Sequence, residues 1–179
     1  TKAESTLTWD DLIVHNRRLL DSRSNRYFFV KDPVKIRISN APHQEVKLKL
    51  HPDFPERGIR EFTTGEEFFI AREDYNLIKE GKLYRLMDCL NFVRKGNELF
   101  FDSIEVSKYR EHGEKIFHWL PVASELISVK VMMPDKSIAE GIAEPLVSKV
   151  ELGSIIQFER FGFCRRDSAE DLLFIKAHD

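Results

Sequence analysis

The chain has 179 residues, of which 42% are hydrophobic and 32% charged, and its formal net charge is -2. This composition is typical of a folded, soluble protein with a substantial core, and it excludes a disordered chain. No run approaches the roughly 18 apolar residues of a membrane helix, so we expect no membrane association. Because the net charge is negative, a general DNA-coating protein is excluded, and any nucleic-acid contact must be local.

One helix and many short strands are predicted along the chain. Thr8 is a candidate N-cap, and apolar residues recur at helical spacing from Trp9 to Leu20. From Arg26 onward the period changes to two, first over residues 34–38. Further strands are expected at residues 46–50, 67–71, 82–93, 98–106, 115–122, 128–133, 154–163 and 172–177. So many short strands predict a mainly all-β chain, folded as barrels or a sandwich.

The two cysteines indicate a reducing compartment. Cys89 and Cys164 lie far apart, form no Cys-x-x-Cys pair, and no signal peptide precedes them. We therefore expect two buried free thiols and a cytoplasmic protein.

No pattern typical of catalysis or metal binding is present. The six histidines show no metal-ligand spacing, and His118 is expected to be a packed core residue. A glycine-rich phosphate loop and a Gly-x-Ser-x-Gly elbow are both missing. We therefore expect no catalytic residue, no metal and no cofactor on this chain.

Aromatic and basic residues are interleaved near the C-terminus, at residues 157–168. Arginine and glutamine carry forked hydrogen-bonding groups that match base edges, and exposed aromatic rings stack on unstacked bases. This interpretation predicts a strand that meets nucleic acid. The alternative is that Phe158, Phe161 and Phe163 belong to the core and the arginines form a solvated face. The spacing alone leaves both open.

Several ordered motifs resemble one enzyme family. They are RYFFVKDPVK at 26–35, HPDFPERGIR at 51–60, GKLYRLMD at 81–88, KIFHWL at 115–120, Ala143-Glu144-Pro145, and QFERFGFCRRDS at 157–168. Together they resemble the C-terminal, anticodon-binding part of glutamyl-tRNA synthetase of the archaeal and eukaryal type, and glutaminyl-tRNA synthetases share the pattern. The segment from Trp9 to Asp21 resembles the helical connector that precedes this part of the family.

The resemblance implies a fold and a function. It implies a helical connector over residues 1–24 and two packed β-barrels over residues 25–179. It further implies a class I ligase that joins glutamate to tRNA(Glu), and tRNA(Gln) is a second candidate substrate. The ATP and Mg²⁺ of this reaction would be used by a catalytic domain whose motifs do not occur here. The chain alone is then expected to be a tRNA-binding monomer that does not aminoacylate and does not bind DNA. Two alternatives stay open, namely a glutaminyl-tRNA synthetase fragment and a stand-alone β-barrel module for RNA binding or protein interaction.

The resemblance also implies which residues read the anticodon. Arg26, Gln157 and Arg160 carry over to the pocket for the middle base, a uridine, and Arg85 carries over to the first base. Strict alternation along a strand would place Gln157 and Arg160 on opposite faces. The assignment therefore requires a bulge or twist, for which Gly162 is a candidate.

Phosphate contacts are expected from basic side chains on the neighbouring segments. Lys31 and Lys35 are the candidates. Contacts of this kind position the RNA but carry no sequence information. Loss of either lysine should therefore weaken all anticodon sequences about equally.

The third anticodon base, cytosine for glutamate and guanine for glutamine, is expected to be read loosely. Glutaminyl enzymes tend to carry a basic pair just ahead of the glycine-lysine that corresponds here to Gly81 and Lys82, whereas residues 74–80 contain only Lys79 as a basic residue. Loss of a bidentate guanine contact removes roughly 1–3 kcal/mol of discrimination. Both bases should then be accepted, unless Arg72 or Arg94 folds into the pocket.

Overall fold

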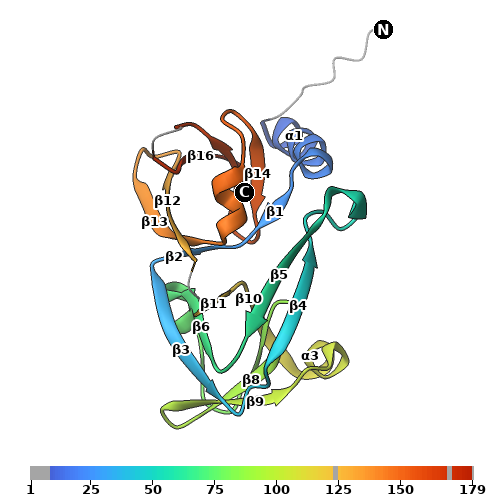
Figure 1. Cartoon of the computed structure of the whole chain (residues 1–179), viewed down its shortest axis with the longest axis vertical. Coiled ribbons are helices and arrows are strands. Elements are labelled where there is room, and N and C mark those ends of the chain that lie inside the picture. Colours follow the sequence, from blue (N-terminus) through green and yellow to red (C-terminus); the bar gives the residue numbers. More distant parts are fainter. Residues whose placement is uncertain (1–8, 123–124, 169–170, 179) are drawn as a thin grey trace, which may run out of the picture.

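The computed structural model describes residues 9–122, 125–168 and 171–178, which form two β-rich units joined along the long axis of the molecule (Figure 1). The first unit holds a seven-stranded sheet in the order β1-β14-β15-β16-β12-β13-β2. The second holds a seven-stranded sheet in the order β10-β7-β8-β9-β3-β6-β11. A two-stranded ribbon, β4 and β5, runs beside both units (Figure 1). The prediction of a mainly all-β chain is confirmed.

The elements have the following bounds. The first sheet consists of β1 (Arg26–Tyr27), β2 (Phe29–Lys31), β12 (Ile127–Met132), β13 (Ile138–Ala143), β14 (Ile155–Phe158), β15 (Gly162–Arg166) and β16 (Leu173–His178). The second consists of β3 (Pro33–Ser39), β6 (Glu67–Ala71), β7 (Leu83–Leu86), β8 (Asn91–Lys95), β9 (Glu98–Ser103), β10 (Gly113–Phe117) and β11 (Leu120–Pro121). The ribbon consists of β4 (Gln44–Lys49) and β5 (Ile59–Thr64). The helices are α1 (Trp9–Arg23), α2 (Arg72–Tyr75) and α3 (Val106–His112), with 3-10 turns η1 (Pro55–Arg57) and η2 (Pro145–Lys149).

The expected closed barrels are corrected to two open sheets. In each sheet the two outer strands are consecutive in the chain, since only Phe28 separates β1 from β2 and only residues 118–119 separate β10 from β11. Two segments that continue one another cannot pair side by side, so the hydrogen-bond ladder stays open there. At the first gap the Phe28 N–H donates to the Glu144 carboxylate at 2.6 Å and not to another strand.

Residues 27–30 are shared between two cores. Tyr27 and Phe29 pack into the core of the first sheet, and Phe28 and Val30 pack into the core of the second. Successive side chains of a strand point to opposite faces, so a strand that runs between two cores must be apolar at every position. All four side chains are accordingly buried.

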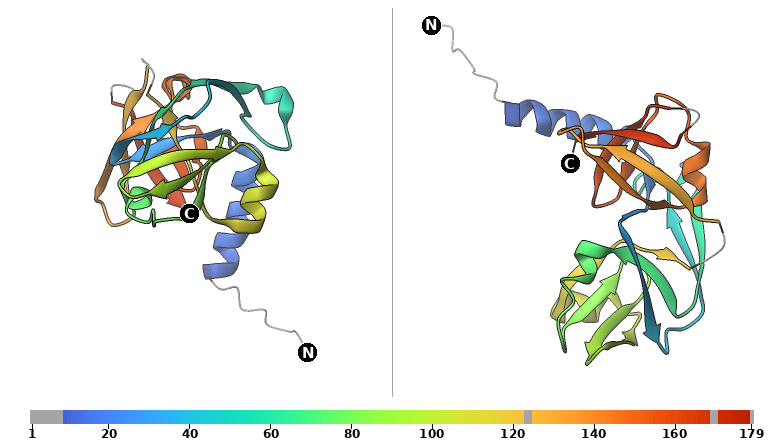
Figure 2. Two further views of the ribbon diagram at one scale, coloured as in Figure 1. Left: turned by 90° about the horizontal axis from the view of Figure 1, so that it is seen from below. Right: turned by 90° about the vertical axis from the view of Figure 1, so that its left-hand side faces the viewer.

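The predicted N-terminal helix is confirmed as α1, whereas its proposed N-cap, Thr8, lies outside the described residues. Two side chains from the loop after β4 satisfy carbonyls at its C-terminal end. His51 Nε2 lies 2.7 Å from the Asp21 carbonyl oxygen, and Arg57 Nη2 donates to the Ser22 carbonyl at 2.7 Å. The rest of α1 extends away from the sheets (Figure 2).

Two predicted strands prove to be hairpins. Residues 82–93 divide into β7 and β8, and residues 154–163 divide between β14 and β15. At each break a tight turn has a non-glycine residue with positive φ in its third position, Asp88 at 52° and Arg160 at 63°. Such positions usually carry glycine or asparagine, so the sequence gives no warning of either turn.

Other elements were missed or divided differently. The sequence did not predict β5 and β13, whose alternation is weak, nor the short helices α2 and α3. The predicted strand at 115–122 is interrupted at residues 118–119, where the chain passes from one edge of the second sheet to the other.

The expected buried thiols are confirmed. Cys89 and Cys164 are both free and buried, 4% and 0% exposed. Burial raises the pKa of each thiol to about 12, because the thiolate would lose its hydration there. Both are therefore protonated and unreactive at neutral pH.

Gly141 allows β13 to approach β2 closely. A Cβ atom at this position would lie 2.9 Å from the Lys31 Cα and closer still to the Val30 carbonyl oxygen. Both are backbone atoms of the paired strand, so they cannot yield without disturbing the pairing. We expect Gly141→Ala to lower the free energy of unfolding by about 1–3 kcal/mol, measured by urea denaturation at constant m-value.

Gly65→Ala is the matched control. Its Cβ would meet only the ring of His43, at 3.2 Å, and that side chain is exposed and can move. A denaturation midpoint for Gly141→Ala as high as that of Gly65→Ala would contradict the close approach.

Candidate nucleic-acid interface

Arg26 and Gln157 lie side by side on neighbouring strands. β1 and β14 run parallel with Arg26 opposite Gln157, and adjacent strands are about 4.7–4.9 Å apart. The Gln157 N–H donates to the Asn25 carbonyl at 2.9 Å, and the Arg26 N–H donates to the Leu50 carbonyl at 2.7 Å. The structure thus brings together two of the three residues predicted to read the middle base.

The Arg26 guanidinium is only partly engaged. Its side chain is 27% exposed, and Nη2 donates to Asp21 Oδ1 at 3.0 Å. Nε is buried and has no hydrogen-bond partner among the described residues. A buried donor without a partner is costly, and a bound ligand is one way in which such a donor is satisfied.

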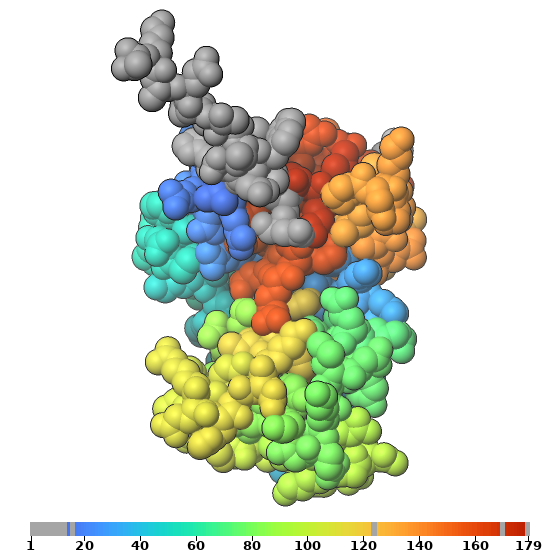
Figure 3. Space-filling view, turned by 180° about the vertical axis from the view of Figure 1, so that it is seen from behind, coloured from blue at the N-terminus to red at the C-terminus, as the bar shows by residue number. Residues whose placement is uncertain are grey.

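Arg160 is exposed and occupies the third position of the turn between β14 and β15. It lies outside the strand, so strand alternation does not apply to it, and the expected bulge at Gly162 is not what directs it. The orange-red surface of the β14–β15 region meets the yellow surface around α3 and β10 (Figure 3). The turn therefore lies at the junction of the two units.

Residues of the second unit face this turn. Burial raises the pKa of Tyr109, and the nearby positive charges of Arg160 and Arg85 oppose that shift. Burial lowers the pKa of His118 to about 4, with Arg160 contributing in the same direction, so the ring is neutral at pH 7. His118 is 6% exposed, which confirms that it is a core residue.

Arg85 is buried in β7 and already has protein partners. It is 4% exposed, and Nη1 donates to Asn91 Oδ1 at 2.9 Å and to the Ile104 carbonyl at 3.1 Å. Burial lowers the pKa of its guanidinium. These contacts give Arg85 a structural role in the second sheet, and its role as reader of the first base stays a prediction.

Lys31 and Lys35 are exposed but do not line the pocket that contains Arg26. Lys35 Nζ lies 2.9 Å from Glu67 Oε1 on the surface of the second sheet. Lys31 lines separate hollows, one of them shared with Asp32 and Arg72. Their role as phosphate contacts stays a prediction.

The aromatic residues of the 157–168 segment belong mainly to the core. Phe158 and Phe163 are fully buried, and Phe158 packs against Phe29 and Phe174 at ring distances of 5.0 and 5.2 Å. Base stacking is therefore wrong for Phe158 and Phe163, because their faces are covered by the first sheet. Phe161 is half-buried and meets Phe29 edge-on at 5.0 Å.

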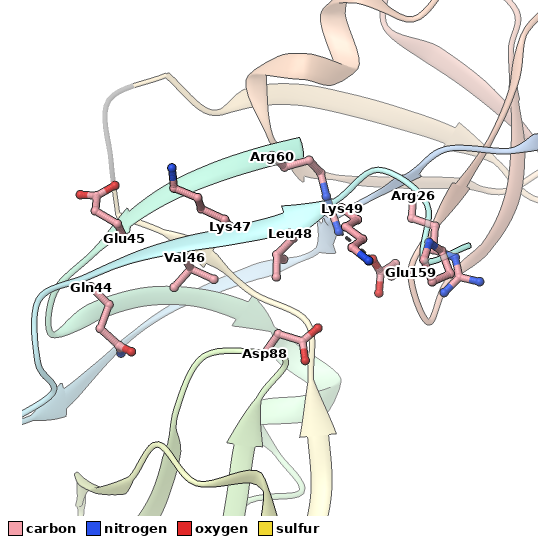
Figure 4. Close-up of a pocket in the computed structure, with 11 residues that line it drawn as sticks. Arg26, Gln44, Glu45, Val46, Lys47, Leu48, Lys49, Arg60, Asp88 and Glu159 are labelled. Atoms are coloured by element: carbon pink, nitrogen blue, oxygen red, sulfur yellow. Dashed lines mark hydrogen bonds and ion pairs between the residues drawn. The ribbon is translucent and has the colours of Figure 1, made fainter. Parts of the chain in front are cut away.

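Arg26 lines a pocket of about 480 Å³ bounded by the ribbon, the first sheet and the β7–β8 turn that carries Asp88 (Figure 4). Its other lining residues are Gln44, Glu45, Val46, Lys47, Leu48, Lys49, Pro52, Arg60, Asp88 and Glu159. The lining mixes donors and acceptors, which is what recognition of a polar base edge requires. Gln157 and Arg160 are not part of this lining, but they flank Glu159 in the same hairpin.

The most buried group of this pocket is the Arg60 guanidinium, on β5. Its Nη1 lies 2.7 Å from Glu144 Oε1 and its Nη2 lies 2.7 Å from Glu159 Oε1. Sequence patterns do not indicate this network, because its three members are far apart in the chain. Only the fold brings them together.

Arg72 and Arg94, the arginines that could restore third-base selectivity, both have protein partners. Arg72 Nε pairs with Asp32 Oδ2 at 2.7 Å, and Arg94 donates to the carbonyls of Gly96 and Ile78. Neither lines the pocket that contains Arg26.

The described part of the chain has neither a metal-ligand cluster nor a membrane-spanning helix. Its His, Cys, Asp and Glu side chains form no group of three or more that could hold a metal ion. Its helices include none with the length and apolar character needed to cross a membrane.

Comparison with known proteins identifies the family. Two family models, both described as the anticodon-binding domain of class I tRNA synthetases (E and Q), match residues 24–110 and 116–167. The glutamate–tRNA ligase of Methanocaldococcus jannaschii is 38% identical over 97% of this chain and 32% of its own length. That of Pyrococcus abyssi is 38% identical over 99% of this chain and 32% of its own. That of Methanothermobacter marburgensis is 39% identical over 98% and 31%.

The chain spans about a third of the length of these curated relatives. The matched segments include β1, β14 and the turn that carries Arg160. From the two family models and the near-complete coverage by these ligases, the chain belongs to the anticodon-binding domain family of the class I tRNA synthetases for glutamate and glutamine.

Proposed function

We propose that this chain recognises the anticodon of tRNA(Glu) as part of a glutamate–tRNA ligase that joins glutamate to this tRNA with ATP. The main observation in its favour is that Arg26 and Gln157 lie opposite one another on paired strands, with Arg160 beside them in an exposed turn of left-handed conformation. Residues held in sparsely populated backbone conformations cluster at functional sites. The names of the relatives supply the amino acid.

Hydrogen-bonding chemistry favours uridine as the middle base. The Watson–Crick edge of uracil presents two carbonyl acceptors and one N–H donor. Arg26 and Arg160 supply only donors, and the Gln157 amide supplies both donors and an acceptor. Cytosine carries an amino donor where uracil has a carbonyl, so it would oppose an arginine donor in the same place.

We assign ATP and Mg²⁺ to the parts of such a ligase outside this chain. The sequence has no phosphate loop, and the described acidic and histidine side chains form no group suited to a metal. The residues of this chain therefore do not fit either group. We also propose that the chain acts in the cytoplasm and as a monomer, because its two cysteines are free thiols and nothing in its sequence indicates self-association.

Acceptance of tRNA(Gln) is the finer part of the proposal. The basis is the absence of a forked guanine reader in residues 74–80, whose one basic residue is Lys79. Arg72 and Arg94 already have protein partners, which are Asp32 and the Ile78 carbonyl respectively. The family description itself covers both the glutamate and the glutamine enzymes.

Arg160→Ala tests the reading of the middle base. If Arg160 contacts the uridine edge, its loss should weaken binding of the anticodon stem-loop by about 1–3 kcal/mol and flatten the preference for uridine. Lys35→Ala is the comparison, because a lost phosphate contact should weaken all sequences about equally and reduce the salt slope by about one unit. If Arg160→Ala weakens binding equally for all four middle bases, Arg160 contacts phosphate and does not read the base.

The chain alone should not form an adenylate. Incubation of the 179-residue chain with ATP, glutamate, tRNA(Glu) and labelled pyrophosphate should give no exchange above the blank, because the nucleotide motifs are missing. A full-length relative, such as the Methanocaldococcus jannaschii ligase, is the positive control. Exchange by the isolated chain would contradict the assignment of catalysis to other parts of the enzyme.

Competition between two stem-loops that differ only at the third base tests the breadth of tRNA choice. We expect cytosine and guanine to be accepted with affinities that differ by less than about tenfold, or 1.4 kcal/mol. A larger preference for cytosine would leave an enzyme specific for tRNA(Glu).

A further inference from the structure

We propose that Arg60 is a positioning residue for the middle-base pocket, joining the strand of Arg26 to the turn of Arg160. The inference rests on the proposed reading of the middle base and extends it to a residue whose guanidinium is buried against two carboxylates. Arg60 comes from the ribbon, which belongs to neither large sheet.

The Arg60 guanidinium is buried and binds two carboxylates at once. Its side chain is 2% exposed, and two guanidinium nitrogens each lie 2.7 Å from a different glutamate, Glu144 and Glu159. The guanidinium also lies over the Phe28 ring, 4.6 Å from its centroid. Because the guanidinium is rigid and planar, fixing it fixes both carboxylates relative to one another.

The contact between Arg60 and Glu144 holds the strand that carries Arg26. Glu144 Oε1 accepts from Arg60 and also from the Phe28 N–H, at 2.6 Å. Phe28 is the gap between β1 and β2, where the ladder of the first sheet is interrupted. Without this acceptor the Phe28 N–H would be buried without a partner, two residues after Arg26.

The contact between Arg60 and Glu159 holds the turn that carries Arg160. Glu159 directly precedes Arg160, and its N–H donates to the Tyr27 carbonyl at 2.9 Å while its carboxylate meets Arg60. Arg160 has a φ of 63°, a conformation that persists only where the surroundings impose it. Backbone and side-chain contacts of Glu159 together supply that constraint. Figure 4 shows Arg60 and Glu159 meeting beside Arg26.

The energetics favour a positioning role over a purely stabilising one. Burial raises the pKa of both Glu144 and Glu159, and Arg60 opposes this shift, so the network keeps two acids around one cation at a desolvation cost. Apolar residues of similar volume often replace such buried groups without loss of stability. A network of this kind is therefore best explained by the geometry it fixes.

Glu159→Ala in the full chain is the first variant, because it releases the turn and leaves Glu144, Arg60 and Phe28 joined. Glu159 also lines the pocket, so Arg60→Lys, which removes no acceptor from the pocket, must show the same loss. Binding of anticodon stem-loops with uridine or cytosine at the middle base gives the discrimination ratio. We expect this ratio to fall by about fivefold or more, with affinity for the cytosine stem-loop changed by less than about twofold. Glu159→Gln keeps an acceptor for Arg60 and should retain most of the ratio.

Two further variants complete the test. Arg60→Lys keeps the charge but loses the rigid planar fork that holds the two carboxylates in a fixed geometry, so the folded variant should lose discrimination as Glu159→Ala does. Glu140→Ala removes an equal charge from an exposed position on β13, where Glu140 is 3.9 Å from Lys130, and should leave the ratio unchanged. Unfolding curves establish which variants are folded. If Arg60→Lys is not folded, an unchanged ratio in Glu159→Ala still overturns the positioning role.

The outcomes separate the two proposals. No preference for uridine in the unaltered chain would overturn the proposed function itself. A preference that Glu159→Ala, or folded Arg60→Lys, leaves within about twofold of the unaltered chain would overturn the positioning role alone. A similar fall in Glu140→Ala would also overturn it, because the effect would then be one of net charge.

Discussion

The structure depends on one stretch of backbone, residues 26–31, which serves two cores at once. The side chains of residues 27–30 alternate between the core of the first sheet and that of the second, so neither core is complete without this stretch. The same stretch supplies both outer strands of the first sheet and therefore cannot close that sheet by pairing with itself. The two units are thus joined by shared burial, and a displacement of this strand would disturb both.

Polar chemistry concentrates where this strand is interrupted. A backbone N–H that leaves the ladder inside the protein needs an acceptor, and Glu144 provides one. A buried carboxylate in turn needs a cation, which Arg60 provides from the ribbon. The other terminal nitrogen of Arg60, Nη2, then binds Glu159. The residues proposed to read RNA lie at the edge of this network, so the arrangement that satisfies the fold also orients the readers.

The charge distribution is consistent with local and selective RNA contact. The chain has a net charge of -2, and several basic residues of the candidate interface have carboxylate partners, as Arg26 has Asp21 and Lys35 has Glu67. Exposed pairs of this kind contribute little to stability and also reduce the attraction for phosphates. Arg160 makes no hydrogen bond or ion pair within the described part of the chain, which leaves its donors available.

The sequence by itself determined the strand-rich class, the first helix and the buried thiols, because period and composition report local burial directly. Its ordered motifs also indicated the family and the candidate readers. Tertiary structure alone decided that Phe158 and Phe163 are core, that Arg85 is buried, and that Arg60 meets two distant glutamates. It also decided the turns at Asp88 and Arg160, where a residue other than glycine occupies the left-handed position, so that the sequence does not indicate a turn. Such features depend on contacts between residues distant in the chain, and local patterns do not encode which distant residues will meet.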